Sequence, residues 1–258
     1  KIRFGRADDF SDRLSKPAGE MPTWSGELYL ELQRGTLTTQ SRSKRGNRLL
    51  ELALRQTEYL LACADLGDYP IEELDGIWKT MLLNQFHDIL PGSSIRKVYE
   101  VTEREHADGL AACKRMQQEV AERLFPADDE SLTLVNTLNV PFTHAIALPD
   151  GWSGADGVLS QRESDGTVTA QVEIPPQGMI ALERSNDATP AAEVSGLVLE
   201  NDLVRYEFDE NGQLVSAFDK QADKAFLAKT GNVLTLYEDR PNHFDAWDID
   251  IFYETQAL

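Results

Sequence analysis

The segment NQFHDILPGSSI, residues 84–95, marks a break between two helical patterns. The Pro-Gly pair inside it does not continue a helix, so the preceding helix should stop near His87 and Asp88. Ser93 or Ser94 can then cap the helix that follows. An imidazole and a carboxylate therefore lie side by side at a turn, where side chains can project into a neighbouring cleft. The imidazole of such a pair can bind a metal ion while the neighbouring carboxylate supports it. The default interpretation is a structural or surface histidine.

Helical periodicity lies on both sides of this break. A first helix should begin near Ser43, a second near Ile71, and a third should end near Leu124. The expected apolar stripe of the second helix comprises Ile71, Leu74, Trp78, Met81, Leu82 and Phe86. Three helices with short connections predict an antiparallel three-helix bundle over residues 41–126. A basic cluster at the start of the first helix (Arg42, Lys44, Arg45 and Arg48) is read as a solvated face, or as a surface for an acidic partner.

After residue 130 the pattern becomes β. The expected strands are Leu132–Val135, His144–Leu148, Val168–Ile174, Met179–Leu182, Leu197–Leu199, Leu203–Phe208 and Val233–Tyr237. The Asn211-Gly212 pair predicts a hairpin. Short strands at this spacing indicate an antiparallel β-sandwich-like domain over residues 127–258, with a linker-like stretch near residues 185–195 that can divide two strand sets. The predicted fold class is therefore α+β and multidomain.

The charge balance argues against nucleic acid as a partner. The 258 residues include 25 Lys and Arg against 44 Asp and Glu, a net charge of −19, whereas phosphate binding needs clustered basic residues. No apolar run approaches the ~20 residues of a membrane span, so no membrane partner is expected. Cys63 and Cys113 show no metal-binding spacing and fall on apolar helix faces, which predicts buried free thiols. These features fit a protein of the reducing cytoplasm.

The segment DRPNHFDAWDID, residues 239–250, combines carboxylates with aromatic rings and an arginine. Sugar sites use carboxylates to bind hydroxyls and aromatic faces to pack on the ring. A cation loop is another option, because calcium prefers oxygen ligands, although the EF-hand spacing is absent. An alternating strand with a solvated acidic face is the default interpretation.

Three stretches resemble glycoside hydrolase family 38, the retaining α-mannosidases. They are residues 22–40, which begin PTWSGELY, residues 78–94, which contain NQFHDILPGSS, and residues 239–253. Their order and spacing also match the family. The resemblance is to an internal piece of a longer polypeptide: the end of the catalytic α/β barrel in residues 1–40, then the helical bundle, then the start of the β region.

The resemblance implies retaining hydrolysis of α-mannosidic bonds with zinc or another divalent metal ion. The last metal ligand of the family carries over to His87, and Asp88 matches a position that contacts sugar hydroxyls or supports the metal. Glu31 falls near the family's acid/base region, as a candidate only. Gln33 and Leu37 depart from the His and Tyr that bacterial relatives often show, so substrate contacts are not carried over to them.

The family's nucleophile and other metal ligands lie before residue 1, so we expect a fragment that is inactive alone. Its partners should be α-mannosides or mannose-containing glycans, and a homo-oligomer is an open option. The alternative from another class is a non-catalytic carbohydrate-binding or scaffolding module, which the β region and its acidic aromatic segment suggest.

Overall fold

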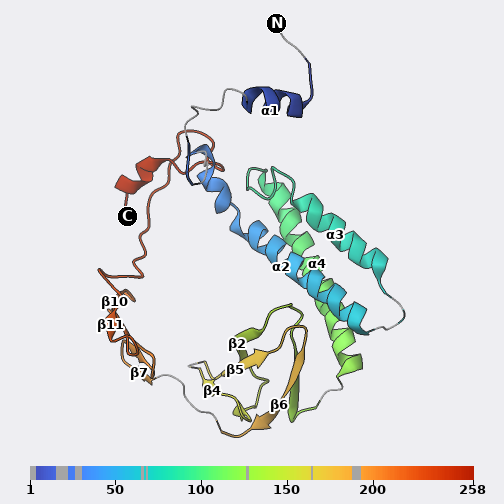
Figure 1. The fold of residues 1–258 in the computed structure, drawn as a ribbon, viewed down its shortest axis with the longest axis vertical. Coiled ribbons are helices and arrows are strands. Elements are labelled where there is room, and N and C mark those ends of the chain that lie inside the picture. Colours follow the sequence, from blue (N-terminus) through green and yellow to red (C-terminus); the bar gives the residue numbers. More distant parts are fainter. Residues whose placement is uncertain are drawn as a thin grey trace.

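The computed structural model describes residues 4–15, 23–26, 31–64, 67, 69–125, 128–163, 165–187 and 193–258. Its α-helices are α1 (Ala7–Ser15), α2 (Ser41–Ala64), α3 (Ile71–Asn84) and α4 (Arg96–Leu124), and its 3-10 helices are η2 (Glu31–Leu37) and η3 (Ile251–Thr255). The strands that follow α4 form antiparallel sheets, so the fold class is α+β (Figure 1). None of the helices in these ranges is long and apolar enough to cross a membrane.

Helices α2, α3 and α4 pack together around one apolar core (Figure 1). The buried members of this core are Leu50, Leu54, Leu74, Met81, Cys113 and Met116. A Cβ atom on Gly109 of α4 would lie only 3.0 Å from Leu50 Cδ1 and 3.1 Å from Ile77 Cγ2. The absence of a side chain at this position therefore lets α4 approach both other helices closely.

The apolar stripe predicted for α3 is wider than its contact with the core. Leu74 and Met81 are buried, but Ile71, Leu82 and Phe86 are exposed. The helix packs along one narrow line, so residues at the margins of the periodic stripe face outward. Cys113 is buried as expected, whereas Cys63 is exposed, because it lies near the end of α2 beyond the last buried residue of that helix.

Residues 128–187, the first β region, form two three-stranded sheets. One has the order β1 (Ser131–Val135), β6 (Met179–Ser185), β3 (Gly154–Ala155), and the other has β2 (Phe142–Ala147), β5 (Val168–Ile174), β4 (Ser160–Arg162). Strand β5 alternates strictly, with every second residue buried. Side chains from both sheets enter one core that contains Trp152, Val172 and Leu182. The spacing of apolar residues along β5 therefore determines which face of its sheet meets the core.

Residues 193–258, the second β region, contain a five-stranded sheet. Its order is β11 (Lys224–Ala225), β10 (Leu214–Asp219), β9 (Val204–Phe208), β8 (Val198–Glu200), β7 (Glu193–Ser195). The predicted hairpin is confirmed, because β9 and β10 pair across the Asn-Gly turn, where Gly212 has a φ of 74°. The predicted strand Val233–Tyr237 is wrong: within the described residues, that stretch makes only an isolated bridge, Tyr237 to Ala257.

Candidate functional site

The connection between α3 and α4, residues 85–95, is a hydrogen-bonded turn that carries His87 and Asp88. Helix α3 stops at Asn84, earlier than predicted, and the N–H groups of Gln85 and Phe86 donate to the carbonyls of Leu82 and Leu83, at 3.2 and 3.1 Å. The N–H groups of residues 89 and 90 both donate to the Phe86 carbonyl, at 2.8 and 3.1 Å. These local bonds begin a tight turn before Pro91. Helix α3 therefore ends before it reaches the Pro-Gly pair that was expected to end it.

The predicted capping role of Ser93 or Ser94 is wrong. The N-cap of α4 is Ile95, which has no side-chain capping bond. Instead, Ser94 Oγ donates to the Asp88 carbonyl at 2.6 Å, and Ser93 Oγ lies 3.2 Å from Asp88 Oδ1. The hydroxyl of Tyr99 accepts the Ser94 N–H at 2.9 Å and donates to the Ile89 carbonyl at 3.1 Å. These hydroxyls therefore stabilise the turn, and not the start of the helix.

His87 projects from this turn into solvent, with 76 % of its side chain exposed. Its Nε2 lies 3.4 Å from Asp88 Oδ2, and its ring centroid lies 4.2 Å from that of Phe86. The contacts of the imidazole are thus with its two neighbours in the chain. This exposure leaves the ring accessible to a metal ion, and it is also the position of an ordinary surface histidine.

The donor set at this turn fits part of a metal site. An imidazole nitrogen and a carboxylate oxygen are ligands that zinc accepts, and zinc sites in enzymes use at least three protein ligands. Across the ranges that the structure describes, no three His, Cys, Asp or Glu side chains are grouped closely enough to hold an ion. His87 and Asp88 therefore suit a shared site that other residues complete.

The acidic segment 239–250 does not form the alternating strand that its sequence suggests. The N–H groups of Trp247 and Asp248 both donate to the Phe244 carbonyl, at 2.7 and 2.9 Å, and Phe244 has a φ of 57°. This turn buries Asp248 to 5 % exposure. Its Oδ1 has no hydrogen-bond partner among the described residues. The sequence did not predict this buried carboxylate, because its burial depends on contacts with residues far away in the chain.

Helix η2 makes the contact with this segment. The Gly35 N–H donates to the Trp247 carbonyl at 2.7 Å, and a Cβ atom on Gly35 would lie 2.8 Å from the Trp247 carbonyl carbon. Gln33 and Leu37, the two positions that depart from the bacterial pattern, are exposed. Glu31 begins η2, but its side chain lies outside the described part of the structure.

A chain of contacts connects the three stretches that the sequence singles out. Gly35 contacts Trp247 at one end, and its carbonyl accepts the Thr39 N–H at 2.8 Å. Thr39 in turn packs on Gly92, where a Cβ atom would lie 2.7 Å from Thr39 Cγ2. Residues 31–40 therefore lie between the 239–250 segment and the 85–95 turn and contact both of them, and Figure 1 shows the chain near its C-terminus returning to the start of α2.

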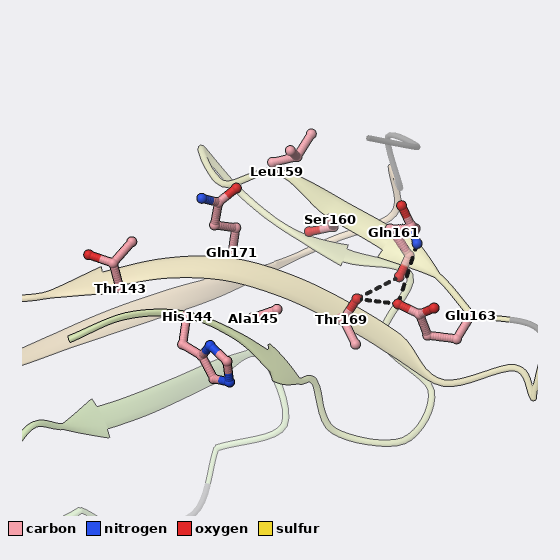
Figure 2. Close-up of a pocket in the computed structure, with 9 residues that line it drawn as sticks. All are labelled: Thr143, His144, Ala145, Leu159, Ser160, Gln161, Glu163, Thr169 and Gln171. Atoms are coloured by element: carbon pink, nitrogen blue, oxygen red, sulfur yellow. Dashed lines mark hydrogen bonds between the residues drawn. The ribbon is translucent and has the colours of Figure 1, made fainter. Parts of the chain in front are cut away.

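A separate hollow of about 420 Å³ lies over the β2–β5–β4 sheet (Figure 2). Thr169 Oγ1 donates to Glu163 Oε1 at 2.7 Å, and Gln161 Nε2 approaches the same oxygen at 3.5 Å. Figure 2 shows Gln171 and Thr143 rising from the sheet, with Thr143 at the end of the hollow farther from Glu163. The complete lining is Thr143, His144, Ala145, Leu159, Ser160, Gln161, Glu163, Thr169 and Gln171. Its chemistry is that of amides, hydroxyls and one carboxylate.

Comparison with known proteins gives one family from both parts of the chain. The alpha mannosidase middle domain family matches residues 31–124, and the glycosyl hydrolases family 38 C-terminal domain matches residues 199–258. Alpha-mannosidase 2C1 of Mus musculus is 31 % identical over 270 residues, covering 99 % of this chain and 25 % of the relative. Alpha-mannosidase G of Dictyostelium discoideum is 27 % identical over 302 residues, covering 98 % and 28 %.

Solved structures share the fold at lower identity. An alpha-mannosidase from Enterococcus faecalis V583 superposes with a TM-score of 0.58 at 19 % identity, over 84 % of this chain and 33 % of that one. A glycosyl hydrolase family 38 protein from Enterococcus faecalis gives a TM-score of 0.55 at 18 % identity, over 92 % and 38 %.

Together the matches define a chain of the α-mannosidase class of glycoside hydrolases. The chain belongs to glycosyl hydrolase family 38, as its three motifs indicated. It spans about a quarter of the length of the curated relatives that it matches.

Proposed function

We propose that these residues are part of a retaining, metal-dependent α-mannosidase that hydrolyses α-mannosidic bonds in mannose-containing glycans. The observation that supports this most directly is the contact chain from residues 239–250 through η2 to the 85–95 turn. Three motifs that are far apart in the sequence meet at one place, as the edge of an active site requires. The curated relatives that match the whole chain are named alpha-mannosidases.

In this proposal His87 is a metal ligand and Asp88 binds sugar hydroxyls or supports the metal. Zinc or another divalent ion, when bound, would orient the substrate and polarise its hydroxyls. The Asp88 carboxylate accepts a hydrogen bond from Ser93 Oγ on Oδ1 at 3.2 Å, and its Oδ2 lies 3.4 Å from His87 Nε2. The exposed imidazole of His87 offers a nitrogen at the same surface.

Retention requires two carboxyl groups, one that attacks the anomeric carbon and one that donates and then accepts a proton. Glu31 is our candidate for the acid/base residue, because it falls near the acid/base region of the family and opens the helix that contacts residues 239–250. We propose that the nucleophile and the remaining metal ligands belong to a barrel outside these residues. The isolated chain should then have no hydrolytic activity.

We also propose a division into three parts. Residues 1–40 would be the end of the barrel, residues 41–126 an antiparallel three-helix bundle, and residues 127–258 a β-sandwich region in two strand sets. The separate apolar cores of the helices and of the first β region support this division. The second β region begins a new sheet at β7, close to the predicted boundary near residues 185–195. A cytoplasmic location remains a proposal, supported by two cysteines that are both free.

The metal role is tested by replacing His87 with alanine in an α-mannosidase polypeptide that contains these residues. We expect the purified His87→Ala protein to lose bound metal and turnover of an aryl α-mannoside. His144→Ala, which alters an exposed histidine on β2, is the matched control for metal content and should retain the bound metal. Unchanged metal stoichiometry in His87→Ala would refute the ligand role, and turnover by the isolated 258 residues would refute the inactivity.

The hollow over the β2–β5–β4 sheet favours a second candidate function, a carbohydrate-binding module. Its volume lies within the roughly 300–1,000 Å³ that is typical of small-molecule sites, and its amides and carboxylate can bind hydroxyls. Calorimetric titration of the 258-residue chain with mannose tests this function. Binding that disappears in Gln171→Ala and Glu163→Ala would support it, and heat changes equal to those of dilution would exclude it.

A further inference from the structure

Lys44, in the first turn of α2, reaches the backbone of two other segments. Its Nζ donates to the carbonyls of Leu90 and Pro91 in the 85–95 turn, at 2.8 and 3.2 Å. It also donates to the carbonyl of Thr39, immediately before α2. An ammonium group has three N–H donors, so these three carbonyls use all of them.

The ammonium group of Lys44 binds backbone carbonyls and, among the residues that the structure describes, does not pair with a carboxylate. Its ammonium is half-buried, and burial lowers the pKa of Lys44 from its ordinary value of 10.5. In the described part of the chain no Asp or Glu forms an ion pair with it, whereas Lys79 and Lys220 do have such partners. Hydrogen bonds from a charged donor are stronger than those between neutral groups.

A steric contact reinforces the same junction. Gly92 has a φ of 104°, and a Cβ atom there would lie 2.8 Å from both Thr39 Cβ and Thr39 O. The 85–95 turn therefore lies directly on Thr39 at the place where Lys44 joins the two segments. Neither segment can shift without breaking a bond to the ammonium group.

The position of His87 depends on this turn. Its side chain is 76 % exposed, and it contacts Phe86 and Asp88, which belong to the same turn. Its placement relative to the helices is consequently set by the backbone of the turn. Within the described residues, the turn is anchored by Tyr99 on one side and by Lys44 with Thr39 on the other, and Gln85 at its start donates to Asn47 Oδ1 at 3.0 Å.

We propose that Lys44 is a positioning residue for the His87–Asp88 pair, and that it acts by holding the Leu90 and Pro91 carbonyls against the start of α2. This inference rests on the proposed role of His87 in metal binding. Lys44 contacts neither side chain of the pair. Its effect reaches them through the turn, which distinguishes it from the exposed members of the basic cluster, such as Arg45.

The first test measures zinc affinity by competition with a chelator, in an α-mannosidase polypeptide that contains these residues. Lys44→Met should weaken zinc binding by on the order of 10–100-fold, the usual effect of losing a group that orients a ligand. Lys44→Arg keeps the charge and several donors and should restore part of the affinity. Lys79→Met removes an exposed lysine of α3 and should bind zinc as the unmodified protein does.

The second test follows amide hydrogen exchange in the 258-residue chain. The N–H groups of Leu90 and Gly92, bonded to the carbonyls of Phe86 and Ile89, should exchange at least several-fold faster in Lys44→Met. Amides in the middle of α4 should keep their rates. If Lys44→Met loses its helical circular dichroism, Lys44→Gln, which keeps two donors, replaces it in both tests.

The outcomes separate this inference from the proposed function. Equal zinc affinity in Lys44→Met and the unmodified protein, with loss in His87→Ala, overturns the positioning role alone. Retained zinc in His87→Ala overturns the metal role of His87 and with it the basis of this inference. Unchanged exchange at Leu90 and Gly92 overturns the positioning role by itself.

Discussion

Polar side chains bridge the helices of residues 41–125, whereas the strands of residues 128–187 meet over a core of apolar side chains. In the helical region, Asn84 Nδ2 donates to Glu105 Oε2 at 2.8 Å, and Thr102 Oγ1 donates to Asn84 Oδ1 at 2.8 Å. The first β region instead packs Trp152, Val172 and Leu182 between its sheets. The turn carrying His87 belongs to the helical region, where hydrogen bonds from Lys44 of α2 and Tyr99 of α4 hold it.

Charge differs between the same parts of the chain. Residues 1–125 carry 18 basic and 20 acidic side chains, whereas residues 126–258 carry 7 and 24. The excess of acid therefore belongs almost entirely to the β regions, where it lies mainly on exposed strand positions and turns. It favours solubility and says little about the substrate.

The largest expected effect comes from the core of the helical region. Leu54 is completely buried between α2 and its partners, so Leu54→Ala should lower the free energy of unfolding by about 2–5 kcal/mol. Val172→Ala is the matched change in the first β region. Denaturant unfolding followed at 222 nm, and by fluorescence in a chain whose Trp24, Trp78 and Trp247 are replaced by phenylalanine so that Trp152 alone reports, should show that each change shifts the transition of its own region. Equal shifts of both signals by both variants would contradict separate cores.

A smaller effect is expected at Gly46 of α2. A Cβ atom there would lie 2.4 Å from His106 Nδ1, so Gly46→Ala should destabilise the helical region by about 1–3 kcal/mol. Gly76 of α3 is the control, because no atom lies within 4 Å of its added Cβ. Gly76→Ala should stabilise by about 0.5–1 kcal/mol through helix propensity alone. Thermal unfolding measures both changes, and the same sign for the two would refute the proposed close contact.

The smallest effect is a pH dependence from His106. Burial between the helices lowers the pKa of His106 below its ordinary value of 6.5, and the nearby charge of Glu105 opposes this shift. Both ring nitrogens lack a hydrogen-bond partner among the described residues. Below pH 6.5 His106 is protonated in the unfolded chain but stays neutral in the folded chain. The free energy of unfolding is therefore highest above that pH and decreases as the pH falls.

His106→Gln should remove this component of the acid sensitivity. The measurement is the free energy of unfolding of the helical region between pH 7.5 and pH 5. An identical slope in the variant and the unmodified chain would assign the acid sensitivity to other groups.

Much of the fold could be predicted from periodicity. Strand β5 occupies the predicted residues, and the hairpin of β9 and β10 follows from its Asn-Gly pair. Periodicity gave a wrong prediction where the segment has no neighbouring strand to pair with. Val233–Tyr237 alternates as a strand would, but within the described residues it makes only an isolated bridge. The same reason explains Leu82, which continues the apolar stripe of α3 beyond its contact with the core.

The candidate site was predictable only in part. The adjacency of His87 and Asp88 is visible in the sequence, and the resemblance gave each of them a role. Lys44 was hidden within a basic cluster, because its partner Leu90 lies 46 positions away. Asp248 was hidden in an acidic segment for the same reason, since its burial depends on a turn that packs against η2. Contacts over such separations have no local signature.

The hydrogen bond from Gly35 to Trp247 has a consequence for folding kinetics. It joins residues 212 positions apart, and closing so long a loop costs entropy that is repaid only when the intervening regions are ordered. The meeting of η2 with residues 239–250 should therefore be a late event in folding. A mutation that slows folding of either β region should then delay the contact between η2 and residues 239–250, although every residue of that contact is intact.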